Sequence, residues 1–460
     1  MRRKVYMLTF FKALDSFVWG VPLLVLLVGT GIYLSTRLRL LQVLKLPLAF
    51  KLIFAEDKGE GDISSFAALA TALAATVGTG NIVGVATAIK AGGPGALFWM
   101  WIAAFFGMAT KYAEGLLAIK YRTKDANGEV SGGPMYYIIN GMGKKWKPLA
   151  IFFALAGILV AFLGIGTFSQ VNSITASLKN SFNWSPQIVS ILIAIVVAVI
   201  IFGGIQSIAK VSEKLVPFMA AAYIIATLIV IFMHYNHIIP AIEQVFSGAF
   251  TGTAAVGGFA GAVVKEAIQN GIARGVFSNE SGLGSAPIAA AAAKTHEPAE
   301  QGLISMTGTF IDTLVICTLT GLSILVTGKW TVKGLEGAPL TQSAFATVFG
   351  NIGVLVLTLC LVLFAFTTIL GWSYYGERCF EFLFGVKHIN IYRSIFIIMV
   401  ALGGFLELDL IWTIADIVNG LMAIPNLIAL LALSPIIIAE TRNYFKRKNK
   451  SFIKTKTRLG

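Results

Sequence analysis

Long stretches without a charged side chain constrain this chain more than any other feature of its sequence. Three of them, from Pro148 to Leu178, from Asn180 to Ala209 and from Leu215 to Ile242, each exceed the roughly 20 apolar residues that cross a bilayer as a helix. Only 13% of all residues are charged, whereas soluble domains carry about 25%, and the mean hydropathy is +0.81. The sequence therefore predicts an all-α integral membrane protein.

Eleven segments are long and apolar enough to span a membrane. They are centred near residues 26, 77, 105, 160, 197, 224, 260, 315, 363, 400 and 425. The first, residues 14–36, follows a basic start, but it is too long for a signal peptide and lacks a small-residue cleavage site, so we interpret it as a membrane helix. An odd number of helices places the two termini on opposite sides.

The positive charges predict the orientation. With the basic tail at 441–460 taken as cytoplasmic, 27 of the 36 Lys and Arg residues lie on that side and 8 on the other, and Lys111 remains inside a helix. Because cytoplasmic loops are enriched in these residues, we expect a multi-pass protein of the plasma membrane with its N-terminus outside. The net charge of +14 then reflects loop bias beside the lipid bilayer, and no nucleic-acid partner is expected.

The chain also contains a weak internal repeat. An offset of 179 residues places Val77-Gly78 on Val256-Gly257 and predicts two five-helix halves, residues 63–235 and 245–440, after the extra helix at 14–36. An odd number of helices in each half forces the halves into opposite orientations, which is the inverted-repeat plan of many secondary transporters. In a sequence rich in Ala, Gly and Val, the match can also arise by chance.

The segment TVGTGNIVG at residues 76–84 predicts a broken helix. It holds three glycines within seven residues, and each weakens a helix by about 1 kcal/mol relative to alanine. Non-helical backbone at membrane depth is tolerated only where it lines a cavity, and its amides and carbonyls can then bind a carboxylate and a cation. The alternative is close helix packing through Gly80 and Gly84.

The matching segment of the second half is the glycine-rich run from Gly257 to Gly261. Paired interruptions in corresponding halves are typical of a transporter binding site. Phe259 and Val263, one helical turn apart, would form an apolar wall of that site.

Three polar side chains lie in apolar segments. Gln170 offers an amide at membrane depth, either to a substrate or to a neighbouring helix. Asp312 and Asp416 are either candidates for ion coupling, because buried charge is costly, or helix-end residues that bind backbone. The sequence contains no Walker loop, metal-ligand cluster or nucleophile elbow, so we expect neither an enzyme nor a cofactor.

Three motifs resemble one family. TVGTGNIVGVATAIKAGGPGALFWMWIAAFFGMATKYAEGLLAIKY (76–121), RGVFSNESGLGSAP (274–287) and TTILGWSYYGE (367–377) are similar to the signature of the alanine/glycine:cation symporters, also called sodium:alanine symporters. The similarity spans nearly the whole chain. It implies a LeuT-like core of ten helices after an extra first helix, sodium coupling and small neutral amino acids as substrates.

The residues favour the same substrate class. We expect no acidic side chain near either glycine-rich break, so an amine without its own carboxylate finds no anionic partner there. A zwitterionic amino acid, alanine or glycine above all, brings both charges. We expect its carboxylate to take the amides of Thr79, Gly80 and Asn81, with Gln170 nearby.

A second group of residues is expected to hold sodium. Trp372 follows Thr367 and Thr368 by about one helical turn, so all three can point the same way. The tryptophan either closes the pocket or anchors the helix at the interface, and the resemblance favours the pocket. The threonine hydroxyls, with carbonyls of Ala75 and Gly78, would bind sodium, unless both threonines bond back to the preceding turn.

Other classes of function stay open at this point. A channel also uses broken helices, although it usually forms a pore from rings of subunits or charged filters. A carrier driven by protons instead of sodium would carry the same substrates.

Overall fold

The computed structural model describes residues 2–57, 59–251, 260–405 and 408–458. Its first part contains α1 (Arg2–Val18), α2 (Val21–Arg37), α3 (Leu41–Leu44), α4 (Leu46–Ile53), α5 (Ser65–Thr76), the π-helical turn η1 (Gly80–Gly84), α6 (Val85–Gly92), α7 (Gly95–Lys120), β1 (Thr123–Lys124), β2 (Val130–Ser131), α8 (Pro134–Tyr137), η2 (Ile138–Met142), η3 (Lys144–Trp146), α9 (Lys147–Leu163), α10 (Phe168–Phe182), α11 (Pro186–Ile201) and α12 (Gly204–Met233). The second part contains η4 (Tyr235–His237), α13 (Ile238–Phe250), α14 (Ala260–Asn279), α15 (Ala286–Ala291), α16 (Pro298–Thr309), η6 (Phe310–Cys317), α17 (Thr318–Val326), η7 (Lys329–Thr331), α18 (Gly337–Phe349), α19 (Asn351–Phe384), η8 (Val386–His388), α20 (Ile389–Leu402), η9 (Gly403–Phe405), α21 (Leu408–Ala432) and α22 (Ser434–Arg458).

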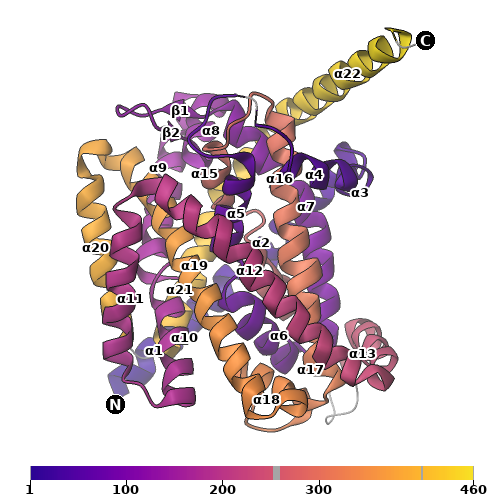
Figure 1. Ribbon diagram of the computed structural model, residues 1–460, viewed down its shortest axis with the longest axis vertical. Coiled ribbons are helices and arrows are strands. Elements are labelled where there is room, and N and C mark those ends of the chain that lie inside the picture. The colour runs from indigo at the N-terminus through magenta and orange to yellow at the C-terminus, as the bar shows by residue number, and fades with distance from the viewer. Residues whose placement is uncertain (1, 58, 252–259, 406–407, 459–460) are drawn as a thin grey trace.

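The bundle is helical throughout, apart from the short antiparallel hairpin of β1 and β2 (Figure 1). Among the described residues, eight helices are long and apolar enough to cross a membrane, and the bent pair of α5 and α6 makes a ninth. These nine coincide with predicted segments. Of the other two, α11 is shorter than the rest, and α14 starts next to residues that the structure does not describe. The all-α membrane architecture is confirmed, but the number eleven is not.

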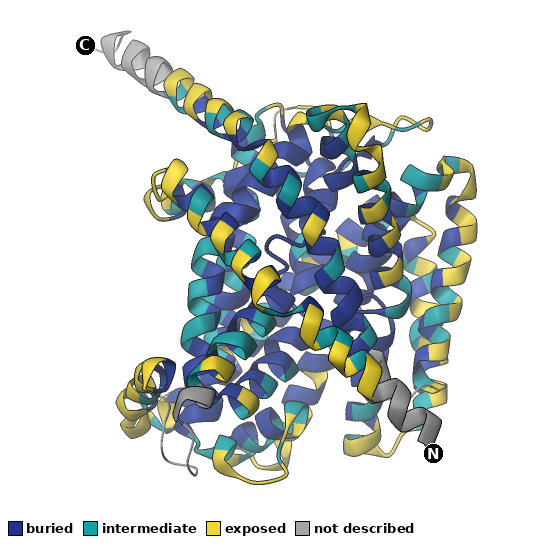
Figure 2. Cartoon of the chain, turned by 180° about the vertical axis from the view of Figure 1, so that it is seen from behind, coloured by how far each residue is buried: buried dark blue, intermediate teal, exposed yellow. Residues whose placement is uncertain are grey.

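The outer surface of the bundle is apolar. Helix α11 exposes Ile188, Leu192, Ile195 and Val199, each at more than half of its full surface. Figure 2 shows the buried residues gathered in the centre and the exposed ones along the outside of the outer helices. In water such a surface would drive association, whereas in a bilayer it is the face that contacts lipid.

The central helix is α19, which packs against α5, α9 and α10. It packs tightly on α5 at Gly371, where an added Cβ would lie 2.7 Å from the Cβ of Ala75. This contact leaves no room for a larger residue and brings the middle of α19 against the end of α5.

The two ends of the chain lie at opposite ends of the bundle. Helix α1 starts at the lower end in Figure 1, and α22 projects from the upper end. This agrees with an odd number of spans. Which end faces the cytoplasm stays a prediction, as do the boundaries of the two halves. One residue counted with the cytoplasmic loops, Arg274, lines the same cavity as Lys12 of α1.

At the end of the bundle that carries α22, a buried arginine ties α19 to the β1–β2 hairpin. Arg378 forms ion pairs with four carboxylates, of Asp125, Glu129, Glu377 and Glu381. Asp125 and Glu129 belong to the hairpin, and Glu377 also pairs with Arg393 at 2.6 Å. A network of charges therefore connects α19 to the hairpin at this end of the bundle.

Candidate functional site

Helix α5 breaks in the interior of the bundle. It begins at Ser64, whose hydroxyl accepts the N–H of Ala67 and so caps the first turn. The helix ends at Thr76, and the chain resumes in η1 and α6 at an angle of 51° to α5. The predicted break within residues 76–84 is confirmed.

Asn81 holds the two sides of the break together. Its side-chain oxygen accepts the N–H of Gly78 at 2.8 Å, and its side-chain nitrogen donates to a carboxylate oxygen of Asp312 at 2.7 Å. The hydroxyls of Ser278 and Thr313 donate to the other carboxylate oxygen at 2.9 and 2.7 Å. The expectation that no acid lies near the break is therefore wrong, because η6 brings Asp312 there from 231 residues away.

Gly78 lies where three helices meet. A Cβ added to it would lie 2.5 Å from Oγ1 of Thr368 in α19 and 3.6 Å from Oε1 of Gln170 in α10. The lack of a side chain at Gly78 keeps the space between these two polar groups open. The structure thus brings together Gly78, Gln170 and Thr368, which the sequence proposed separately.

Several polar groups around this space have no partner within the described residues. The side chain of Gln170 is fully buried, and neither its oxygen nor its nitrogen is hydrogen-bonded. The hydroxyl of Thr79 is also buried and unpaired. The N–H of Asn81 is paired and donates to the carbonyl of Gly78 at 3.3 Å. Buried polar groups are rarely left unpaired, so this arrangement is typical of a ligand site.

The two threonines of α19 face different neighbours. Both hydroxyls donate to the carbonyl of Phe364, at 3.0 and 2.9 Å, as the back-bonding alternative expects. Thr368 lies over Gly78, whereas Thr367 lies 3.5 Å from the sulfur of Met219 in α12. Only Thr368 is brought to the break.

A second helix break lies at residues 280–285, between α14 and α15. Three residues adopt positive φ there, Glu280 at 55°, Gly282 at 86° and Gly284 at 83°. The buried carboxylate of Glu114 accepts the N–H groups of Gly282 and Gly284 at 3.1 and 3.2 Å, and the side chain of Asn426 donates to it at 2.7 Å. These bonds satisfy backbone groups that the helix no longer pairs.

The sequence placed this second break elsewhere. Of the predicted run from Gly257 to Gly261, the first three residues lie outside the described residues, and Ala260 and Gly261 belong to α14. Phe259 also lies outside the described residues, and of Val263 only its place in the first turn of α14 is described. The offset of 179 residues does not superimpose the two breaks that the structure shows.

Trp372 connects α19 to the second break. It is fully buried, and its indole N–H donates to a carboxylate oxygen of Glu280 at 2.9 Å. The hydroxyl of Ser285 donates to the other oxygen of Glu280. An interfacial anchor would reach the headgroups, so the tryptophan is an interior residue one turn from Thr368.

The sequence left open whether Gly80 belongs to a helix break or to a close helix contact, and in the structure it belongs to both. A Cβ added to it would lie 3.1 Å from Cα of Ser278 and 3.5 Å from the ring of Phe277, so η1 packs tightly on the end of α14. At Gly84 nothing lies within 4 Å. Close packing therefore explains Gly80 but not the second glycine of the pair.

A cavity of about 690 Å³ is lined by residues of α1, α10 and α14 and by the start of α18. It reaches Gly84 in η1, Ser173 in α10 and Phe277 in α14, whose ring lies next to Gly80. Asp416 does not lie at the break. It pairs with Arg274 on the wall of this cavity, with the nearest atoms 2.9 Å apart.

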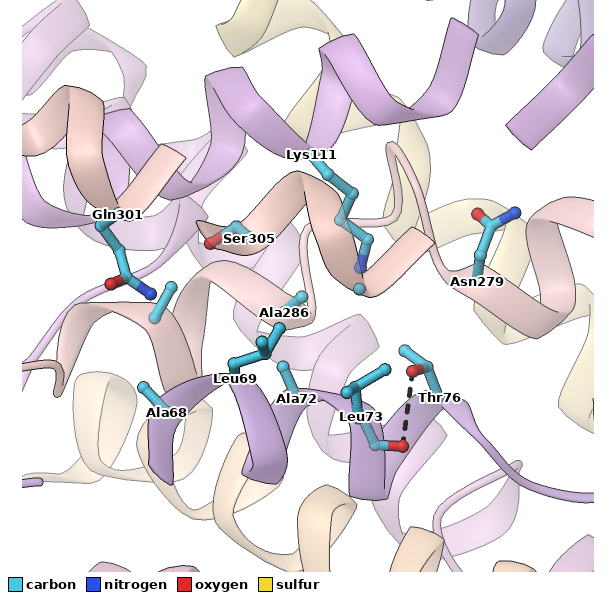
Figure 3. A pocket seen from close by; sticks show the side chains of 12 residues that line it. Ala68, Leu69, Ala72, Leu73, Thr76, Lys111, Asn279, Ala286, Gln301 and Ser305 are labelled. Atoms are coloured by element: carbon cyan, nitrogen blue, oxygen red, sulfur yellow. Dashed lines mark hydrogen bonds between the residues drawn. The ribbon is translucent and has the colours of Figure 1, made fainter. Parts of the chain in front are cut away.

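On the other side of the break, a cavity of about 20 Å³ contains a buried lysine. Figure 3 shows Lys111 of α7 pointing into it between Thr76, Asn279 and Ser305. No hydrogen bond joins its ammonium to another described residue, although it interacts electrostatically with three carboxylates, of Glu114, Glu280 and Asp312. The volume suits about one water molecule.

Sequence reasoning missed Glu114, Ser278 and Glu280. The signal for the second break was present, since SGLGSAP at residues 281–287 contains two glycines and a proline within seven residues. That run lies beside a polar stretch, and it therefore looked like a loop between helices. Nothing in the sequence indicated which helix face Glu114 occupies.

Two helices are broken, and unpaired polar groups lie where these helices meet two others. This arrangement defines a secondary transporter of the LeuT-like class. The crystal structure of MhsT in complex with L-phenylalanine has the same fold, with a TM-score of 0.57 at 14% identity over 83% of this chain and 98% of that one. The expected LeuT-like fold is confirmed.

The chain belongs to the sodium:alanine symporter family, which it matches over residues 4–458. It is 57% identical to an uncharacterized transporter of Haemophilus influenzae, over 95% of this chain and 96% of the relative. It is 52% identical to the sodium/alanine symporter AgcS of Methanococcus maripaludis (96% and 98%) and 38% identical to the probable sodium/glutamine symporter GlnT of Bacillus subtilis (94% and 90%). The chain is therefore a sodium-coupled amino-acid symporter, and not an enzyme.

Proposed function

We propose that the protein carries alanine or glycine together with sodium, through the site around Gly78. The observation that carries this proposal is the buried, unpaired amide of Gln170, which faces Gly78 and Thr368 at the helix break. A substrate carboxylate can accept the N–H groups of Thr79 and Gly80, which lie where α5 gives way to η1. Its ammonium can donate to the unpaired Gln170 oxygen, so one zwitterion can bind both the backbone of the break and this side chain.

The bulk of Trp372 supports a small substrate side chain. The fully buried Trp372 lies one turn from Thr368 on the same helix, and Glu280 fixes the direction of its indole. The closer similarity to a relative described as a sodium/alanine symporter, at 52%, than to the one described as a probable sodium/glutamine symporter, at 38%, favours alanine.

Uptake of labelled amino acids into proteoliposomes tests this proposal. We expect alanine and glycine to accumulate under an inward sodium gradient, with glutamine and phenylalanine much weaker. Uptake by a carrier should saturate. Unlabelled alanine on the opposite side of the membrane should accelerate the exchange of labelled alanine by counterflow. A flux without saturation or counterflow would indicate a channel, and uptake driven by a proton gradient without sodium would favour the proton-driven alternative.

For sodium, we propose the carbonyls of Ala75 and Gly78 with the hydroxyl of Thr368. Oxygen ligands suit this hard cation, and the Ala75 carbonyl lies in the last turn of α5, directly before the break. The Gly78 carbonyl already accepts one N–H and has a second lone pair. Thr367, the fourth residue expected from the sequence, lies on the side of Met219.

The adjacent threonines make a matched pair for a test. Thr368→Ala is expected to raise the sodium concentration for half-maximal uptake by about tenfold, since losing one contact to an ion costs about 1.5–3 kcal/mol. Thr367→Ala removes the same hydroxyl and the same bond to Phe364, and should leave sodium dependence unchanged. Equal sodium dependence of both variants and wild type would place the ion elsewhere, and Asp312 would be examined next.

A further inference from the structure

A basic groove lies at the end of the bundle that carries α22. It encloses about 390 Å³ between the α2–α3 turn and the first half of α22. Its lining contains five basic side chains and no acidic one: Arg37, Leu38, Arg39, Leu41, Leu44, Lys45, Ile438, Thr441, Arg442, Phe445 and Lys446. The groove is separate from the substrate site, which lies in the interior between α5, α10 and α19.

The five basic groups are not neutralised by the protein. In the part of the chain that the structure describes, none of them belongs to an ion pair. The acid of α22 that lies nearby in sequence, Glu440, pairs with Lys120 at 2.5 Å instead. Two of the five contact aromatic rings, Arg37 that of Tyr33 and Lys45 that of Phe445. Like charges gathered in this way repel one another unless an anion lies between them.

The backbone is strained where it forms one wall of the groove. Arg39 and Leu40 have φ of 57° and 53°, a left-handed conformation that residues with a Cβ rarely adopt. This sharp turn reverses the chain after α2 and sets Arg39 opposite α22. Strain of this kind persists where the surrounding structure requires it, and it is concentrated at ligand sites.

Apolar side chains continue the groove toward the lipid. Leu38, Leu41 and Ile438 line it, and Val43 and Leu44 of α3 expose 49% and 67% of their surface beside it. A ligand that fits must therefore combine a negative group with aliphatic chains.

We propose that the groove binds an anionic phospholipid, with its phosphate among the five basic groups and its acyl chains along α3. Basic clusters next to membrane helices attract such lipids, and each Lys or Arg raises the affinity several-fold. A free phosphate offers the same negative group without the chains, so the test must separate the two.

The test uses the full-length protein purified in a neutral detergent and native mass spectrometry with phosphatidylglycerol or phosphatidylcholine of equal chain length. We expect wild type to retain phosphatidylglycerol at lower concentration than phosphatidylcholine. The double variant Arg39→Gln/Arg442→Gln should weaken phosphatidylglycerol binding about thirtyfold. Lys144→Gln/Lys145→Gln removes two exposed charges outside the groove and should bind as wild type does.

Two further outcomes decide the proposal. Equal retention of both lipids by wild type, or unchanged phosphatidylglycerol binding in the Arg39/Arg442 variant, would overturn it. Added inorganic phosphate at millimolar concentration should not displace the lipid, and displacement would mean that the groove is a phosphate site. A thermal melt of each variant, with alanine present, checks that the substrate site is still folded.

Discussion

Gly78→Ala is expected to lower sodium-driven alanine uptake by roughly tenfold to a hundredfold. The new methyl group would lie 2.5 Å from Oγ1 of Thr368, so the hydroxyl or the helix must move. Overpacking of this kind costs about 1–3 kcal/mol, and each 1.4 kcal/mol is a factor of ten. The substitution also fills the space that Gln170 and Thr368 share. Uptake and alanine affinity are measured in proteoliposomes and by thermal shift.

The matched control for this variant is Gly84→Ala. Gly84 lies in the same broken helix, and nothing lies within 4 Å of an added Cβ. Its uptake should equal that of wild type. Gly80 is less suitable, because a side chain there would displace Ser278 and disturb the packing of α14. Normal alanine uptake by a stable Gly78→Ala protein would contradict a site centred on Gly78.

Gln170→Leu is expected to raise thermal stability and to weaken alanine binding by at least about tenfold. The amide of Gln170 is buried and unpaired, and such a group costs about 1–3 kcal/mol, which leucine of similar size avoids. A structural glutamine that bonded a neighbouring helix would give the opposite sign of stability change. If the amide binds substrate, its loss should weaken alanine binding by at least about tenfold. The two readouts are a melting curve without substrate and the shift that alanine produces.

Asn419→Leu is the corresponding control. Asn419 in α21 is also fully buried, with both amide atoms unpaired. Its replacement should raise stability in the same way but leave the alanine-induced shift unchanged. Should Gln170→Leu bind alanine like wild type, the substrate must lie away from α10.

Much of the fold and part of the site followed from the sequence. The lack of charge predicted the spans, and the glycine content predicted the break in α5. Both features could be predicted because each depends on residues that are close together in the chain. Gln170 was singled out for the same reason, as a polar side chain within an apolar run. Its position opposite Gly78 was not predicted, since it depends on which helices pack together.

The rest depends on contacts between distant residues. Thr367 and Thr368 are indistinguishable by sequence, and only the rotation of α19 decides that the second faces Gly78. Asp312 was weighed as an ion site, but its contact with Asn81 spans 231 residues. The second break was missed because glycine content near Gly257 gave a stronger signal than the polar run after Ser278.

The length of α19 indicates how deep in the membrane the charge network around Arg378 lies. Ten residues separate Thr368 from Arg378, which is about 15 Å along a helix and about half the thickness of the hydrocarbon core. If Thr368 lies near the bilayer midplane, Arg378 and its carboxylates lie at the water boundary. One straight helix then reaches from the ligand site to the aqueous phase. A spectroscopic label on the hairpin that holds Asp125 should therefore report, from the surface, whether the site below is occupied.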